Sequence, residues 1–288
     1  MFFLILSCLL YAFNNLIWKK LLSIFNTWLV LVFRALLTSL LALAVALFFY
    51  SESLYELQEF AYGQVFLASI FGAFGLICMV LALKRGSLFQ LGIFNLMIVL
   101  LTATYLLVFE NIVHKNYFPA AILIVTGFTC YNIQTKKTNS TKLSKTQFLL
   151  FSTMAVFFAA SALIHWKNLQ QSTPAIISVM IQEFVVFALV ALLILAKPRL
   201  LPKKTIGPQL RAMAPYVVFM AVIIFSAVWL GFIGLQSTNP LISALIGLIT
   251  PIATILLGIF IYKDQCTTLT LGASLFIIVG VYWLNLSL

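Results

Sequence analysis

The sequence has 288 residues, of which 64% are hydrophobic and only 8% are charged, and its mean hydropathy is +1.15. A water-soluble domain of this size could not hide so much apolar surface, so we expect an integral membrane protein. The net charge of +11 would favour nucleic-acid binding in a soluble protein. Here the cations lie in short connections between apolar segments, which argues against nucleic acid and indicates contact with anionic lipid.

Apolar stretches of about 17–25 residues recur along the chain, which is the length that a helix needs to cross a bilayer. The first has no cation before it, so we interpret it as a span and not as a cleaved signal. None alternates as a barrel strand does, so we expect an all-α bundle. We predict ten transmembrane helices, over residues 2–17, 27–50, 64–83, 87–109, 118–133, 147–164, 174–196, 213–233, 240–262 and 268–287.

The two halves of the chain resemble each other at their ends. Trp18-Lys19 closes the first span and Trp166-Lys167 closes the sixth, and the fifth and tenth spans end in similar Gly- and Asn-containing stretches. Because each half has an odd number of spans, the halves must have opposite orientations, which is typical of secondary transporters. We expect two inverted five-helix repeats, at residues 1–133 and 147–288, with a polar linker at 134–146.

Two charged residues lie well inside predicted spans, Arg34 in the second and Glu183 in the seventh. A charge within the membrane is costly, so it normally faces the bundle interior and has a partner. Counted at 1.5 Å per residue from opposite faces, their depths differ by only about 6 Å. We predict that they pair or face one aqueous cavity, either locking the halves together or binding substrate. Glu183 is also the candidate for proton coupling.

Uncharged polar residues lie at comparable depth in other spans. Amides and hydroxyls suit polar groups of a substrate, and Trp and Tyr add a flat face with one hydrogen-bonding tip; helix–helix hydrogen bonds are the alternative use. Pro251 removes a backbone hydrogen bond and is predicted to be a hinge. With Arg34 and Glu183, the predicted cavity residues are Asn14, Asn15, Asn95, Tyr105, Gln182, Trp229 and Thr250.

Other chemically distinctive residues indicate no cofactor or catalytic centre. The four cysteines are scattered without C-x-x-C spacing, so neither a metal nor a disulfide is expected. We expect His165 to be interfacial, and Trp18 and Trp166 to anchor their spans at the membrane surface. Asp264 is the only aspartate, and neither H-E-x-x-H nor G-x-S-x-G occurs, so the chain is not expected to be an enzyme.

Several short motifs follow one another in a characteristic order. Asn14 and Lys19 close the first span, Arg34 lies near the start of the second, and Ala82-Leu83-Lys84 closes the third. Glu110 closes the fourth span. In this order and spacing, the motifs resemble those of the ten-helix drug/metabolite transporters of the EamA type.

The resemblance continues in the second half, where Pro251 is followed by Asp264 and the last span contains Gly272 and Gly280. Met97 stands where the fourth span of the family has Pro, and Asp264 replaces Glu. The resemblance implies a transporter of small metabolites such as amino acids, in many cases an exporter, that works by alternating access. It also implies that spans one to four and six to nine enclose a cavity, with five and ten peripheral. An intramembrane enzyme and a non-transporting scaffold are the alternatives.

Partners and orientation follow from the charges. Arg34 could pair with a carboxylate or phosphate, which favours an anionic or zwitterionic substrate. Of the 17 lysines and arginines, 14 lie in the odd-numbered connections between spans, counted from the N-terminus. The other three are Arg34, Lys115 and Lys167. The positive-inside rule therefore predicts a multi-pass protein of the cell membrane with both termini outside. We regard a homodimer as an open alternative to a monomer.

Overall fold

The computed structural model describes residues 2–51, 62–110, 117–137, 144–170, 173–201, 206–237, 246–264 and 268–285. In these parts it contains ten α-helices, one short 3₁₀ helix and no strands. The helices are α1 (Phe2–Ile24), α2 (Thr27–Phe49), α4 (Tyr62–Arg85), α5 (Leu88–Phe109), α6 (Tyr117–Lys137), α7 (Lys145–Gln170), α8 (Ala175–Ala196), η2 (Pro198–Leu200), α9 (Ile206–Gln236), α11 (Ile249–Tyr262) and α12 (Thr268–Asn285).

Each predicted span corresponds to one helix, and the differences lie at the helix ends. α1 continues to Ile24 and α7 to Gln170, beyond the ends predicted at residues 17 and 164. Lysine is a good helix former, and its long side chain carries the charge away from the apolar core, so a charged turn can continue a helix. Within the predicted ninth span, 240–262, residues 240–245 lie outside the described part, and α11 begins at Ile249, after an interruption of the helix at Leu248.

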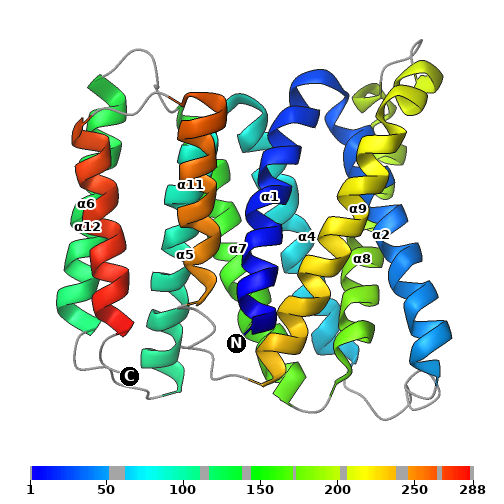
Figure 1. Ribbon diagram of the computed structural model, residues 1–288, viewed down its shortest axis with the longest axis horizontal. Coiled ribbons are helices and arrows are strands. Elements are labelled where there is room, and N and C mark those ends of the chain that lie inside the picture. The colour runs from blue at the N-terminus through cyan, green and yellow to red at the C-terminus, as the bar shows by residue number, and fades with distance from the viewer. Residues whose placement is uncertain are drawn as a thin grey trace.

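The helices alternate in direction, so α1 begins and α12 ends at the same end of the bundle (Figure 1). We call this end the terminal face. The opposite end, where α1 ends and α12 begins, is called the basic face because cations gather near its helix ends. The described ones are Lys19, Lys20, Lys84, Arg85, Lys145, Lys197, Arg199, Arg211 and Lys263.

Hydropathy supports insertion of the bundle in a membrane. Seven of the described helices are long and apolar enough to cross a bilayer, and α6, α11 and α12 each contain a shorter apolar helical stretch. Large apolar side chains point outward, for example Phe260 (76% exposed) and Leu195 (74% exposed). In water these side chains would be unfavourable, whereas lipid tails solvate them. The chain is a multi-pass membrane protein.

Helices of one half pack mainly against helices of the other half. α1 packs against α9 and α11, α2 against α8 and α9, and α4 against α7 and α8. α5 lies against α11 and α7, and α6 pairs with α12 at the edge of the bundle (Figure 1). The core is therefore built between the halves and not within each of them.

Close packing between α6 and α12 depends on two glycines. A Cβ atom added to Gly127 would lie 2.7 Å from the carbonyl oxygen of Ala273, and one added to Gly280 would lie 2.9 Å from that of Ala120. Small residues let two transmembrane backbones approach closely, which replaces the hydrophobic driving force that lipid does not supply. The two glycines thus fix the peripheral helix pair from both sides.

Candidate functional site

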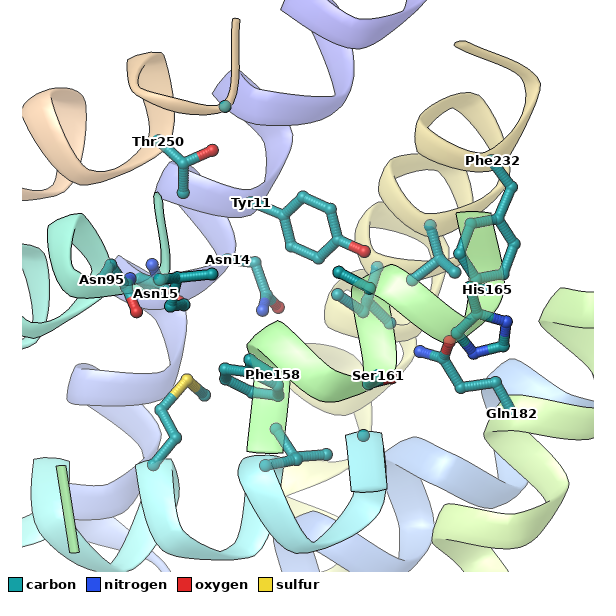
Figure 2. A pocket seen from close by; sticks show the side chains of 18 of the residues that line it. Tyr11, Asn14, Asn15, Asn95, Phe158, Ser161, His165, Gln182, Phe232 and Thr250 are labelled. Carbon is teal, nitrogen blue, oxygen red and sulfur yellow. The ribbon is translucent and has the colours of Figure 1, made fainter. Parts of the chain in front are cut away.

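A cavity of about 390 Å³ lies between the two halves of the bundle. Its walls come from α1, α2, α4 and α5 of the first half and from α7, α8, α9 and α11 of the second (Figure 2). It extends from Trp18 and Met79, in the interior, to Leu235 and Gly247 near the terminal face. The volume is that of a small-molecule site.

The two membrane-embedded charges meet at the wall of this cavity. Arg34 Nη1 lies 2.6 Å from Glu183 Oε2, and the two side chains are each only 2% exposed. The expected ion pair is therefore present, and it joins α2 to α8. Arg34 Nε and Nη2 have no hydrogen-bond partner. Since both residues line the cavity, two charge-bearing donors remain for a bound molecule.

One face of α1 supplies several lining side chains. Tyr11, Asn14, Asn15 and Trp18 are spaced three and four residues apart, so the helix places them on one side. Figure 2 shows the first three of them. Asn15 Nδ2 donates to Thr254 Oγ1 at 3.1 Å, which connects α1 to α11. Asn14 Oδ1 has no partner although the residue is only 3% exposed. Asn15 is thus bound within the protein, whereas Asn14 offers a free acceptor.

The second half supplies a further polar group of the wall. His165 is 1% exposed, neither of its ring nitrogens has a partner, and its ring packs on Phe232 with centroids 4.7 Å apart. Trp166 Nε1 is also without a partner. His165 and Trp166 line the cavity together with Ser161 and Gln182. Figure 2 shows His165, Ser161 and Gln182. Buried polar atoms normally have partners, so these atoms indicate a place for a ligand or water.

Most of the residues that the sequence suggests lie in this one cavity. Thr250 also lines it and donates from Oγ1 to the carbonyl of Cys8 at 3.1 Å. The cavity brings together Asn14, Asn15, Arg34, Asn95, Gln182, Glu183, Thr250 and Pro251. The helical run is interrupted at Leu248, three residues before Pro251, whose missing N–H cannot bond the carbonyl of Gly247.

Two of the predicted residues lie elsewhere. Tyr105 stacks on Phe109, with ring centroids 4.9 Å apart, and Lys167 Nζ lies 5.4 Å from its ring centre. Trp229 packs edge-on against Tyr50 at 6.2 Å, in a cluster between α2, α8 and α9. Depth in the membrane was the basis for choosing both, and depth does not specify which side of a helix a residue occupies.

The sequence analysis missed three aromatic or imidazole groups of the wall. Trp18 and Trp166 line the cavity instead of anchoring helix ends, and Trp18 is only 1% exposed. His165 is buried and not interfacial. The spacing of Trp18 from Asn14, one helical turn, was the available signal. Among the described residues, no group of three or more His, Cys, Asp or Glu could hold a metal ion.

Comparisons with known proteins agree with this architecture. A solved structure titled "Crystal structure of protein" is similar over 97% of both chains, with a TM-score of 0.62 and 14% identity. At that identity the likeness shows the fold alone. No curated protein matches the sequence. Residues 146–286 match the EamA-like transporter family, a family of the drug/metabolite transporter superfamily. The second half of this chain is therefore similar to the EamA-like transporter family.

Proposed function

We propose that the chain is a secondary transporter of small amphipathic metabolites, amino acids among them, that works by alternating access. The observation that carries the proposal is the central cavity, which lies between the two halves of the bundle and has a buried ion pair in its wall. A site between two halves near mid-depth is what alternating access requires, because rocking of the halves then exposes it to either side.

Helix packing supports two inverted repeats. If α1, α2, α4, α5 and α6 correspond in order to α7, α8, α9, α11 and α12, exchange of the halves converts the pair α1–α9 into α7–α4. It likewise converts α1–α11 into α7–α5 and α2–α9 into α8–α4. The pairs α2–α8, α5–α11 and α6–α12 convert into themselves. All of these pairs occur, as expected for a pseudo-two-fold axis.

The charges of the cavity favour a zwitterion. Arg34 and Glu183 neutralise each other, so the site as a whole has no net charge to match with an ion. A carboxylate could bind the free Nε and Nη2 atoms of Arg34, and an ammonium group could approach Glu183. A zwitterion satisfies both without leaving a charge uncompensated in the membrane.

The rest of the wall favours an apolar body with a second polar group. Leu76, Val99, Phe158 and Phe232 line the cavity between its polar residues. His165 could donate from one ring nitrogen and accept at the other when neutral. We therefore place the charged end of the substrate at Arg34 and its far end near His165. Outward transport and a homodimer belong to this proposal as further expectations.

Uptake by purified protein in liposomes, with a panel of radiolabelled amino acids and their N-acetyl and decarboxylated analogues, tests the proposal. We expect saturable uptake of apolar amino acids, weaker uptake of both analogue classes, and a KM raised at least tenfold in Asn14→Ala. Trp229→Phe is the matched control, because Trp229 lies outside the cavity, and its KM should equal that of wild type. Absence of saturable uptake of any compound by folded protein would overturn the amino-acid class.

A further inference from the structure

At the basic face, two charged side chains from other helices hold the turn between α4 and α5. Lys19 Nζ, on α1, donates to the carbonyl oxygen of Leu83 at 3.2 Å and to that of Gly86. These carbonyls lie in the last turn of α4 and immediately after it. The cation thus binds the carbonyl end of a helix, where the backbone dipoles concentrate negative charge.

Asp264, which follows α11, holds the other side of the same turn. Its Oδ2 accepts from the backbone N–H of Phe89, in the first turn of α5, at 3.0 Å. Lys263 has a left-handed backbone (φ 52°), and the N–H of Asp264 donates back to the carbonyl of Gly258 at 3.1 Å. This reversal of the chain directs Asp264 toward α5. An anion at the amino end of a helix complements the positive end of its dipole.

Lys19 and Asp264 therefore clamp one turn from both sides, each at the helix end of opposite charge. They come from α1 and α11, whereas the turn joins α4 and α5. Tyr262 adds a contact in this region, since its hydroxyl donates to the carbonyl of Leu16 at 3.2 Å. These contacts hold the four helices together at the basic face, whereas the cavity lining extends toward the terminal face.

The corresponding residues of the terminal face have different partners. Lys167 follows Trp166 as Lys19 follows Trp18, and Glu110 follows Met97 at the same spacing as Asp264 follows Pro251. Lys167 Nζ lies 2.6 Å from Glu110 Oε1, and the side chains are 43% and 31% exposed. In the part of the chain that the structure describes, this lysine and this carboxylate bind each other.

We propose that these four residues form two alternating latches that set which face of the cavity is closed. In the present state the Lys19–Asp264 latch is engaged with the α4–α5 turn, and the Lys167–Glu110 latch is released. In the opposite state Lys167 binds carbonyls at the end of α9, Glu110 approaches the start of α11, and Lys19 and Asp264 pair with each other. When a latch is released, its lysine pairs with its carboxylate, so no charge is left without a partner. The inference rests on the proposed alternating access.

Accessibility of a single cavity thiol tests the latches without any substrate. Ala162 lines the cavity and is exposed within it, so Ala162→Cys, in a variant with the four native cysteines replaced, is the reporter. A membrane-impermeant maleimide is added to either side of oriented vesicles. Lys19→Met and Asp264→Ala should each lower the labelling rate from the terminal face at least threefold and raise it from the basic face. Lys167→Met and Glu110→Gln should shift both rates in the opposite direction.

Lys20→Met is the matched control, because Lys20 lies next to Lys19 but its ammonium sits 5.5 Å from the ring centre of Tyr216 instead of on a helix end. It should leave both rates unchanged. If Lys19→Met and Lys167→Met shift the rates in the same direction, or not at all, the latches are refuted. If Lys19→Met does not fold, Lys167→Met still shows in which direction the labelling rates change, because the Lys167 side chain is exposed. Labelling from one face only, in every variant, would refute alternating access itself.

Discussion

The Arg34–Glu183 pair leads to a quantitative prediction about stability. Arg34 Nη1 and Glu183 Oε2 are 2.6 Å apart, and the side chains are each 2% exposed. Breaking a buried ion pair by removing one partner costs about 3–5 kcal/mol, because an uncompensated charge stays buried. Since Arg34 also lines the cavity, water there offsets part of this loss. We expect about 3 kcal/mol for Arg34→Met and a similar loss for Glu183→Met, at the lower end of that range.

The double variant Arg34→Met/Glu183→Met should behave differently. It removes both charges at once, and replacing a buried pair by apolar residues of similar volume is often neutral or stabilising. Its free energy of unfolding should therefore lie within about 1 kcal/mol of wild type, whereas independent effects would add to about 6 kcal/mol. Unfolding by SDS in mixed micelles, followed by circular dichroism, measures all three variants. If the double variant loses as much free energy of unfolding as the two single variants together, the pairing argument is refuted. A double variant that is as stable as wild type should still lack transport.

Two further predictions concern helix contacts near the cavity. Asn15→Ala and Thr254→Ala should each lower the free energy of unfolding, and a double-mutant cycle should give a coupling of about 0.6–1.7 kcal/mol, as for other hydrogen bonds between membrane helices; a coupling of zero would contradict the contact. Gly92→Ala should cost about 1–3 kcal/mol by overpacking, since its Cβ would overlap Ile255 Cγ1 and lie 2.9 Å from the carbonyl oxygen of Pro251. Gly207→Ala, with nothing within 4 Å, is the control in the same SDS titration and should change little.

The order of the described helices could be predicted, because the hydropathy of the sequence indicates which segments are apolar enough to lie in lipid. The helix ends could not, because a helix continues into water wherever its residues favour it. Lys19 illustrates the difference: it lies beyond the predicted end of the first span, yet it is helical and binds the α4–α5 turn. A charged residue after an apolar run therefore indicates the membrane boundary better than the helix boundary.

The cavity could be predicted in part because polar groups in lipid must face inward. Asn14 and Arg34 obey this rule and lie in the wall. Tyr105 and Trp229 do not, because an aromatic ring is stable against other rings as well as in a cavity. His165 was missed for the opposite reason, since its place beside Trp166 and Lys167 suggested the membrane surface. Only packing determines which way such amphipathic side chains turn.

Packing between the halves has a consequence for biogenesis. As the chain is synthesised, α1, α2, α4, α5 and α6 enter the membrane before their main neighbours α7, α8, α9, α11 and α12 exist. Each early helix is stable alone in lipid because its backbone hydrogen bonds are internal. The ion pair, the latches and the cavity can form only after insertion of the second half. Until then Arg34 lacks Glu183, the carboxylate that neutralises it in the finished bundle, so a half-made molecule carries an exposed cost that the complete one does not.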